Sequence, residues 1–436
     1  MVVAHFGEPL GLDNSSWGDY NQILLFRQCP KAPGFGAAAF IGRGDYMSVK
    51  GFLSAAVAAD LRYHGRPDLG LILAEAPCSW AGLFTQSVCR AAPVIWSRDR
   101  AAAGLGRAFL ANSGQANAQT GAEGELNCRR SAELVGGAAG CAPEEVMLAS
   151  TGVIGPQLNM KALAPAVPRL VAALGPDRLD DFARAILTTD TRPKTAGESF
   201  DLGGRRVTVW GCAKGSGMIA PHLATMLGFL LTDARLEPGL LRAILAEGAE
   251  LSFNRVTVDG DTSTNDSLMI MASGASGAPE IRSGEALEKF RLAAFTVMKS
   301  LARQIARDGE GATKLVTVRL RGAASEEEAK KAARTVAESP LVKTAFFGQD
   351  ANWGRICMAL GRSGAVFDPY AVDIDLDQVP WIRNGLDNGR EEAATAVMKK
   401  PEYVLDINLN AGPHGCEMLT CDYSHDYISI NGSYRS

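Results

Sequence analysis

At residues 146–155 the chain reads VMLASTGVIG. A short apolar run that ends on Ser-Thr-Gly is typical of a buried strand entering a tight turn. Comparable apolar runs predict further strands at residues 69–74, 107–111 and 205–212. Between these runs, helical periodicity predicts helices at residues 123–135, 161–174 and 179–187. Because strand and helix patterns interleave, the sequence predicts an α/β architecture.

The second half of the chain continues this alternation. The apolar segment at residues 224–231 is expected to pair beside the strand at residues 205–212. Helices are predicted at residues 239–249, 285–307 and 325–337. Further strands are predicted at residues 256–258, 268–272, 314–320, 342–347, 406–410 and 427–431. No change in composition marks a domain boundary near the middle of the chain.

The composition of the 436 residues excludes several classes of protein. With 47% hydrophobic and 21% charged residues, the chain can bury a large core, which excludes intrinsic disorder. A net charge of -4 argues against nucleic-acid binding, because phosphate backbones attract basic surfaces. No run approaches the roughly 18 apolar residues of a membrane span. The nine cysteines form no CxxC pair and no metal-ligand spacing, so we expect reduced, mostly buried thiols, no metal site and a cytoplasmic location.

Residues 1–46 differ from the rest of the chain, since they mix polar and turn-forming residues without sustained periodicity. Met47 then opens a segment that reads as a natural beginning. One hypothesis is that translation starts at Met47. The alternative is that residues 1–46 form a genuine, weakly ordered extension.

Familiar catalytic motifs are absent from the sequence. It contains no GxxxxGK[ST], HExxH or GxSxG motif, and its five scattered histidines offer little material for a Ser-His-Asp triad. Small-residue and hydroxyl-rich turns remain. Residues 214–219 (KGSGMI) precede Ala224-Thr225, and Thr151-Gly152 follows a strand, where it can offer a hydroxyl and N–H groups to an oxyanion. Taken singly, each of these segments also fits an ordinary turn.

Two further segments have structural interpretations. Residues 259–266 (DGDTSTND) look at first like a calcium loop, but they lack its residue order and its twelfth-position glutamate. We interpret them as a hydrogen-bonded turn with a scaffold role. Residues 348–355 (GQDANWGR) fit either a helix cap or the edge of a substrate pocket.

In this order and spacing, the segments resemble the ornithine acetyltransferase (glutamate N-acetyltransferase) family of arginine biosynthesis. The resemblance runs from about Gly51 to Ser436. It rests on strings at residues 112–118, 149–155, 188–191 with Lys194, 214–219, 224–227, 258–266, 346–355, 430–431 and 434–435. The fold that it implies is a layered α-β-β-α sandwich, shared with self-cleaving aminopeptidases, in which two chains form one globule.

Members of this family cut themselves before a threonine, which matches Ala224-Thr225 here. The resemblance implies an α chain of residues 47–224 and a β chain of residues 225–436, assembled as a heterotetramer of two α and two β chains. The Thr225 hydroxyl would attack the carbonyl carbon of Ala224, and cleavage would free an α-amino group with an unperturbed pKa of roughly 7.7–8.0. That amine can serve as general base for the Thr225 hydroxyl, so no histidine is needed.

The implied reaction transfers the acetyl group of N2-acetyl-L-ornithine to L-glutamate through an acetyl-threonine at Thr225. It needs no cofactor, although bifunctional members also use acetyl-CoA as a co-substrate. By the same resemblance, Thr151 and Gly152 form the oxyanion hole. The substrate-binding positions carry over to Thr188, Lys214, Thr225, Glu310, Asn431 and Ser436. From their charges, we expect Lys214 to bind a substrate carboxylate and Glu310 a substrate ammonium.

Three positions depart from the family pattern. Residues 221–225 (PHLAT) stand where the family usually reads Pro-Asn-Met-Ala-Thr, which bears on the rate of self-cleavage. Ser436 replaces the usual terminal threonine, and residues 60–62 replace a Gly-Ile-Lys string.

Three readings compete with the acetyltransferase. One is a self-cleaved aminopeptidase or amidohydrolase of related fold, which passes the acyl group to water. Another is an acyltransferase of a specialised pathway with a different donor or acceptor, and the third is an inactive homologue that binds without cleaving. Free acetate released regardless of glutamate would identify the hydrolase.

Overall fold

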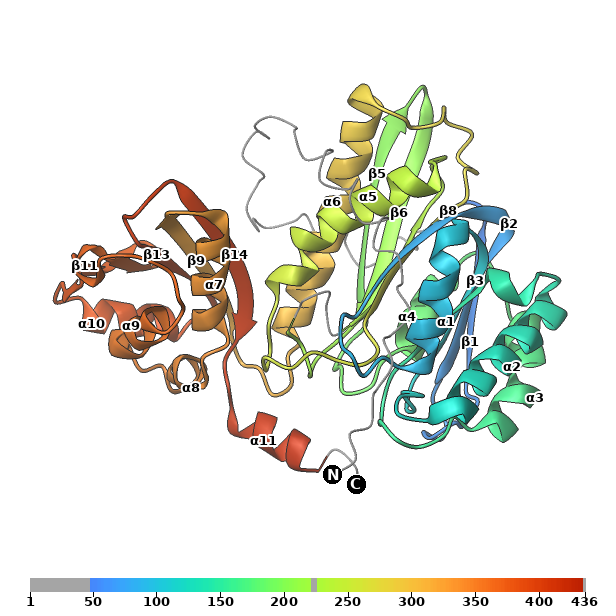
Figure 1. Ribbon diagram of the computed structural model, residues 1–436, viewed down its shortest axis with the longest axis horizontal. Coiled ribbons are helices and arrows are strands. Elements are labelled where there is room, and N and C mark those ends of the chain that lie inside the picture. Colours follow the sequence, from blue (N-terminus) through green and yellow to red (C-terminus); the bar gives the residue numbers. More distant parts are fainter. Residues whose placement is uncertain (1–47, 221–225, 434–436) are drawn as a thin grey trace, which may run out of the picture. The chain divides into compact units, whose positions relative to one another are not determined.

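The computed structural model describes residues 48–220 and 226–433, whose elements form two β-sheets with helices packed on them (Figure 1). Ala224, Thr225 and Ser436 lie outside the described residues, as do residues 1–46. The first sheet has the strand order β4-β3-β2-β8-β7-β6-β5, with β1 paired to β2. Its strands are β1 Phe52–Val57, β2 Leu69–Phe84, β3 Leu105–Asn112, β4 Val146–Ser150, β5 Lys194–Leu202, β6 Arg205–Lys214, β7 Leu227–Thr232 and β8 Ser267–Ala272.

The centre of the first sheet consists of β7 and β8, which are parallel and buried along their whole length. Strands buried on both faces read as continuous apolar runs, as these two do. They lie between β2 and β6, so the strands that follow residues 221–225 are inserted as a pair between strands that precede those residues. The antiparallel pairing of β6 with β7 confirms the predicted pairing within its described part, from Leu227 onward.

Helices cover both faces of the first sheet, which confirms the predicted α/β class. On one face α5 and α6 pack against β2, β5 and β6, and the backbone at Gly211 leaves room for Val297 and Leu301 of α6. On the other face Phe182 of α4 packs edge-on against Phe229 of β7. The helices on this sheet are α1 Ala92–Arg100, α2 Gly121–Ala139, α3 Met160–Ala172, α4 Leu179–Ala185, α5 Pro238–Glu250 and α6 Gly284–Arg307.

The second sheet is built wholly from residues after position 225 and has its own hydrophobic core. Its strand order is β12-β11-β10-β13-β9-β14, with only β9 and β13 parallel. Its strands are β9 Leu315–Ala323, β10 Asp373–Leu376, β11 Val379–Arg383, β12 Leu386–Asp387, β13 Glu402–Asn408 and β14 His414–Cys421. The later helices are α7 Glu326–Ala337, α8 Pro340–Gly348, α9 Trp353–Gly361, α10 Glu391–Met398 and α11 His425–Gly432. Short 3-10 helices are η2 Ala101–Ala103, η3 Pro143–Glu145, η4 Phe253–Arg255 and η5 Pro369–Ala371.

Two of the predicted strands are helices. Residues 342–347 belong to α8, which begins at Pro340 and buries Val342, Ala345 and Phe346 at helical spacing. Residues 427–431 belong to α11, because the Ser424 hydroxyl accepts hydrogen bonds from the first backbone N–H groups of that helix. In both cases a local start signal outweighed an apolar or β-branched composition.

The predicted strand at residues 256–258 is also wrong. Successive N–H groups here bond to different partners, since Thr257 donates to the carbonyl of Leu419 and Val258 to that of Ile219. No ladder can form, and only an isolated bridge at Val256 remains. The other predicted strands and helices with described residues are present, several of them longer than predicted.

The turn interpretations are also resolved. The Asn352 side chain accepts the N–H of Arg355 at 3.3 Å, so residues 348–355 include a helix cap.

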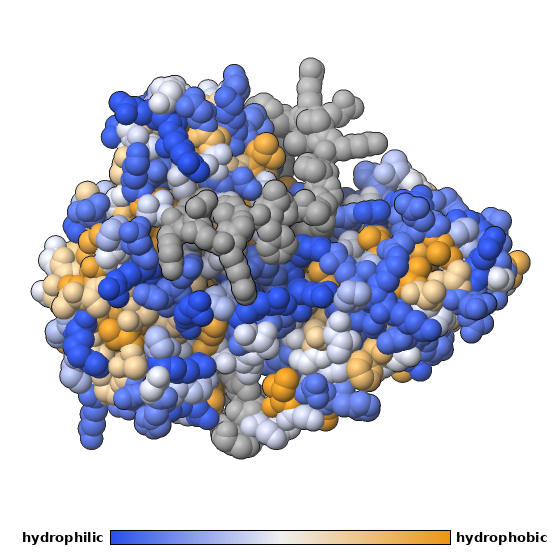
Figure 2. Space-filling model, turned by 180° about the vertical axis from the view of Figure 1, so that it is seen from behind, coloured by the Kyte–Doolittle hydropathy of each residue, from blue (hydrophilic) through white to orange (hydrophobic). Residues whose placement is uncertain are grey.

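Among the described cysteines none forms a disulfide, and five of the eight are buried. Within residues 48–220 and 226–433, no helix is both long and apolar enough to cross a bilayer. The face in Figure 2 is mostly hydrophilic, with apolar residues in small groups between polar ones.

Candidate active site

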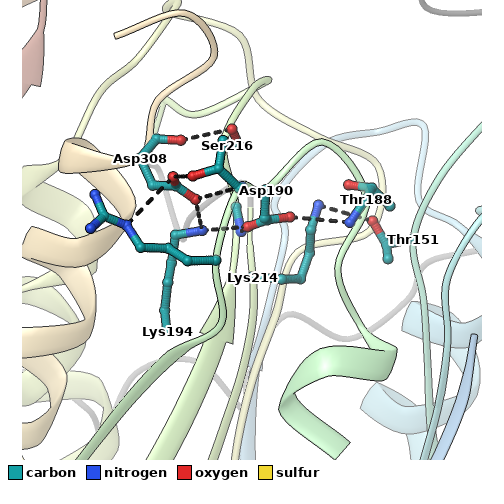
Figure 3. A network of polar contacts seen from close by, with 10 residues as sticks. Thr151, Thr188, Asp190, Lys194, Lys214, Ser216 and Asp308 are labelled. Carbon is teal, nitrogen blue, oxygen red and sulfur yellow. Dashed lines mark hydrogen bonds and ion pairs between the residues drawn. The ribbon is translucent and has the colours of Figure 1, made fainter. Parts of the chain in front are cut away.

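The site forms where β6 ends and the chain continues into the glycine-rich residues 214–217. Lys214 is the last residue of β6, and its Nζ donates a hydrogen bond to Thr151 Oγ1 at 3.2 Å (Figure 3). Thr151 follows β4, so the bond joins the ends of two strands that are not neighbours in the sheet. Both residues are less than a tenth exposed. A lysine amine and a threonine hydroxyl thus meet in a buried polar site.

Asp190 joins this site to the loop before β5. Its Oδ1 accepts hydrogen bonds from Lys194 Nζ at 2.5 Å and from the N–H of Gly215 at 2.7 Å. Its Oδ2 accepts the N–H of Thr188 at 3.2 Å. The side chains of Asp190 and Lys194 are fully buried, so the carboxylate fixes the positions of Thr188 and Gly215 relative to one another.

Asp308, at the end of α6, is the second acid of this network (Figure 3). Its Oδ2 accepts Lys194 Nζ at 2.6 Å, and its carboxylate also accepts the N–H and the hydroxyl of Thr191. Its backbone carbonyl accepts the Ser216 hydroxyl at 2.8 Å. Lys194 therefore lies between two buried carboxylates, and the same two acids contact Gly215 and Ser216.

The charges of the site alter the acidity of its members. Burial lowers the pKa of Lys214, and the negative charge of Asp190 opposes that shift. Burial alone would raise the pKa of Asp190, but Lys214 and Lys194 outweigh it and hold that pKa at about 2. Among the described residues Lys214 makes no ion pair at salt-bridge distance, and its amine donates to the Thr151 hydroxyl.

The Thr151-Gly152 turn has a shape that only glycine permits at its second position. Gly152 has a φ of 126°, and a Cβ there would lie 2.3 Å from the carbonyl carbon of Gly114. The Thr151 N–H already donates to the carbonyl of Asn112. For the Gly152 N–H no bond to another described residue is found. The Thr151 hydroxyl and the Gly152 N–H are therefore the two groups suited to hold an oxyanion.

Asn265, which belongs to residues 259–266, holds the Thr151-Gly152 turn in place. Its Nδ2 donates to the carbonyl of Ala116 at 2.7 Å and to that of Ser150 at 2.8 Å. The two acceptors belong to the chain segments that follow β3 and end β4. This geometry agrees with the scaffold role predicted for residues 259–266.

Glu310 and Asn431 complete the site. Glu310 lies just before β9 of the second sheet, and Asn431 lies in α11, which follows β14. The N–H of Glu310 donates to the carbonyl of Ser216 at 2.8 Å, and its Oε2 accepts Asn431 Nδ2 at 2.8 Å. Glu310 is 5% exposed, and its carboxylate lies so close to Gly217 that a Cβ there would be 2.3 Å away. The buried acid therefore lies directly against the glycine-rich segment.

The structure brings together every predicted site residue that it describes. Residues 214–217 are the common link between them, through Lys214 to Thr151, through Gly215 to the loop of Thr188, and through Ser216 to Glu310 and Asn431. Asn431 reaches the site from a helix, not from the predicted strand. Thr225, Ala224 and Ser436 lie outside the described residues.

Sequence reasoning missed three acids of the site, Asp190, Asp308 and Asp266. Asp190 and Lys194 stand four residues apart, but nothing in the sequence reveals that their pair is buried. Asp266 is buried beside Met226, and among the described residues its Oδ2 has no hydrogen-bond partner. Burial raises the pKa of Asp266 far above its ordinary value. In the described part of the chain, no three His, Cys, Asp or Glu side chains are grouped as metal ligands would be.

Fold and site together define an α/β protein with a buried, polar centre suited to acyl-group chemistry. The model of the ArgJ family matches residues 53–436. The chain is 47% identical over 393 residues to the arginine biosynthesis bifunctional protein ArgJ of Desulfotalea psychrophila, covering 89% of this chain and 100% of that protein. It is 46% identical over 397 residues to the protein of the same name from Symbiobacterium thermophilum, covering 90% and 99%.

This chain belongs to the ArgJ family. Among solved structures, it is similar to ornithine acetyltransferase from Mycobacterium tuberculosis complexed with ornithine. That match has 35% identity and a TM-score of 0.36, and it covers 40% of this chain and 95% of the other.

Proposed function

We propose that this protein transfers the acetyl group of N2-acetyl-L-ornithine to L-glutamate, with Thr225 as the residue that carries it. One observation carries the proposal: residues 214–217 tie the oxyanion turn, Lys214 and Glu310 into one buried site. Membership of a family whose curated relatives are named arginine biosynthesis proteins supports the same reaction. The reaction class is acyl transfer between two amino acids.

The active form arises when the chain cuts itself between Ala224 and Thr225. The Thr225 hydroxyl oxygen attacks the carbonyl carbon of Ala224, and the C–N bond breaks as the acyl group moves to oxygen. Water then opens this ester, leaving a carboxylate on Ala224 and a free amine and hydroxyl on Thr225. The products are an α chain ending at Ala224, beginning at residue 47 if translation starts there, and a β chain of residues 225–436.

In the first half of the reaction the Thr225 amine takes the proton of its own hydroxyl, and the oxygen attacks the acetyl carbonyl. The Thr151 hydroxyl and the Gly152 N–H hold the oxyanion of the tetrahedral intermediate. The C–N bond of acetylornithine then breaks, and the leaving amine takes the proton. The Thr225 acetyl ester and free ornithine are the products of this half.

In the second half the amine of glutamate attacks the acetyl ester. The same oxyanion donors hold the second intermediate. The C–O bond breaks, and the proton lost by the glutamate amine passes through the Thr225 amine to the Thr225 oxygen, which restores the hydroxyl. Lys214 suits a substrate carboxylate because its amine is buried and has no described acidic partner at salt-bridge distance. Glu310, also buried, suits a substrate ammonium. Thr188, Asn431 and Ser436 are proposed to line the same substrate site.

No cofactor takes part in this scheme. Acetyl-CoA can replace acetylornithine as donor in a bifunctional form of the reaction, because the oxyanion donors act on the acetyl carbonyl whatever its leaving group. We also propose that the protein assembles from two α and two β chains and acts in the cytoplasm. Native mass spectrometry of purified protein tests the assembly.

The test of the reaction is an assay with acetylornithine in the presence and absence of glutamate. When glutamate is present, we expect N-acetylglutamate and ornithine in equal amounts. When it is absent, we expect at most one ornithine released per enzyme, with the acetyl group retained on Thr225. Continuous release of free acetate at the same rate in both assays would contradict the transferase and identify a hydrolase. Replacing glutamate with other amino acids distinguishes a specialised acceptor.

A further inference from the structure

The backbone on both sides of residues 221–225 is held by a single segment, which we name the clamp segment (residues 257–267). On the earlier side, Thr257 and Val258 donate to the carbonyl of Ile219, at 3.2 and 2.8 Å. The Thr262 hydroxyl donates to the carbonyl of Ala220 at 2.9 Å. On the later side, Ser267 donates its N–H to the carbonyl of Met226 at 3.0 Å. The two flanks of the proposed cleavage point therefore share one anchor.

Within the clamp segment, Asp259 binds the backbone of Met218 and Ile219, just before residues 221–225. Its Oδ2 accepts the N–H of Met218 at 2.5 Å and its Oδ1 accepts that of Ile219 at 2.8 Å. Two successive N–H groups that point to one side form a concavity suited to an anion. Asp259 is the anion that fills it, and no part of the transferase scheme uses this residue.

The conformation that Asp259 holds is an unusual one for the residue concerned. Met218 has a φ of 56°, in the left-handed region that residues with a side chain seldom occupy. Met218 is 40% exposed, so the packing of its side chain does not by itself explain this backbone. The carboxylate of Asp259, bonded on both sides of the Met218 peptide, is what stabilises it. Such stored backbone strain is common where a reaction needs one geometry.

We propose that Asp259 is a positioning residue for self-cleavage, holding Met218 and Ile219 so that the chain enters residues 221–225 in the direction that attack requires. The inference rests on the proposed function, because it concerns the cleavage that releases Thr225. An attacking oxygen must lie about 3–3.5 Å from the carbonyl carbon along a restricted approach, so small changes in the entering backbone lower the rate strongly. The proposed acetyl-transfer scheme assigns no step to Asp259.

The test follows cleavage of the full chain by pulse-labelling in a cell-free translation system, with fragments resolved under denaturing conditions. The Asp259 carboxylate accepts the N–H groups of Met218, Ile219 and Asp261, Met218 on one oxygen and the other two on the second. In Asp259→Asn one of these oxygens becomes a donor NH₂, so at least one hydrogen bond is lost. We expect cleavage to slow by tenfold or more, while acetyl transfer per cleaved chain stays within about twofold of wild type. Asp233→Asn is the matched control, because Asp233 is a buried carboxylate that accepts the N–H of Thr208 on a remote part of β6.

The double variant Met218→Gly, Asp259→Asn separates positioning from a general loss of folding. Glycine adopts a positive φ without help, so we expect it to restore at least a third of the lost rate. Slow cleavage without this rescue, or equal rates in Asp259→Asn and Asp233→Asn, overturns the inference while the proposed processing stands. A wild-type chain that is never cut contradicts the proposed processing itself.

Discussion

The two sheets of this protein are related to the proposed cleavage point in different ways. In the first sheet β7 and β8, which follow residues 221–225, lie between β2 and β6, which precede them. The second sheet contains only strands that begin after Thr232 and packs its own core. A sheet interleaved in this way holds the two products of cleavage together, whereas a sheet built from one product can only contribute residues to the site. The first sheet would therefore hold the two proposed products together, and the second brings distant residues to the site.

The contribution of the second sheet follows from its register. Leu315 at the start of β9 pairs with Cys421 at the end of β14, so the chain enters and leaves this pair at the same end. Glu310 lies just before β9 and Asn431 lies in α11 just after β14. The pairing of two strands thus brings together two residues that are far apart in sequence, and their side chains meet at 2.8 Å.

The largest expected effect concerns the first sheet and Thr225. We expect wild-type protein to give two fragments under denaturing conditions, with the later one beginning at Thr225, that migrate as one species in native gel filtration. Thr225→Ala removes the attacking oxygen, so we expect a single uncut chain without measurable acetyl transfer. Intact-mass analysis and gel filtration of both proteins check this. Fragments that separate without denaturant would break the comparison, because an interleaved sheet cannot release β7 and β8 intact.

A weaker effect is expected at the Thr151-Gly152 turn of the first sheet, the proposed oxyanion hole. Thr151→Val keeps the shape of the side chain but removes the hydroxyl, so we expect kcat for acetyl transfer to fall by about 10²–10³. Thr344→Val on α8 is the matched control and should leave kcat unchanged. Among the described residues, the Thr344 hydroxyl bonds only within its own helix and to Arg355. Steady-state kinetics on the cleaved fraction measures both. An unchanged kcat in Thr151→Val would remove this residue from the reaction.

How much of this arrangement the sequence revealed differs between the two sheets. In the first sheet β3, β4, β6, β7 and β8 were predicted, since they contain apolar runs, as at residues 146–150. Only the start of the long β2 was predicted, and β1 and the more polar β5 were missed. Around the second sheet, α8 and α11 were wrongly predicted as strands. That prediction followed their apolar residues and overlooked the helix start signals at Pro340 and Ser424. Composition describes burial, whereas a capping side chain decides which backbone hydrogen bonds form first.

The site shows the same limit. The resemblance to the family supplied Thr151, Gly152, Thr188, Lys214, Glu310 and Asn431, and the structure joins them in one network. It gave no role to Asp190, Asp308 or Asp266, because a carboxylate in a sequence carries no sign of burial. Their importance comes from enclosure and from the two lysines near them, which are properties of the folded chain.

A third prediction concerns the stability that the buried ion pairs of Lys194 give to the fold. Lys194→Met removes the cation that contacts both buried carboxylates, those of Asp190 and Asp308, and leaves Asp308 only the more distant Arg192, at 3.7 Å. Removing one partner of a buried ion pair typically costs about 3–5 kcal/mol of the free energy of unfolding. Urea denaturation followed by circular dichroism measures this change. Lys331→Met, which breaks the exposed pair with Glu327 on α7, is the control and should be indistinguishable from wild type.

The smallest effect is the pH dependence of the same network. Lys214 and Lys194 hold the pKa of Asp190 at about 2, below the 3.8 of an unfolded chain. A lowered pKa stabilises the folded protein fully above the unfolded value, and this contribution is lost as pH falls from about 4 through 2. The difference in unfolding free energy between wild type and Asp190→Asn should therefore be constant from pH 7 to 5 and shrink below pH 4. A difference that does not change down to pH 2 would contradict this prediction. It would show that Asp190 stabilises the fold through hydrogen bonds that do not depend on its charge. The polar network around Asp190 would then support residues 214–217 by geometry and not by electrostatics.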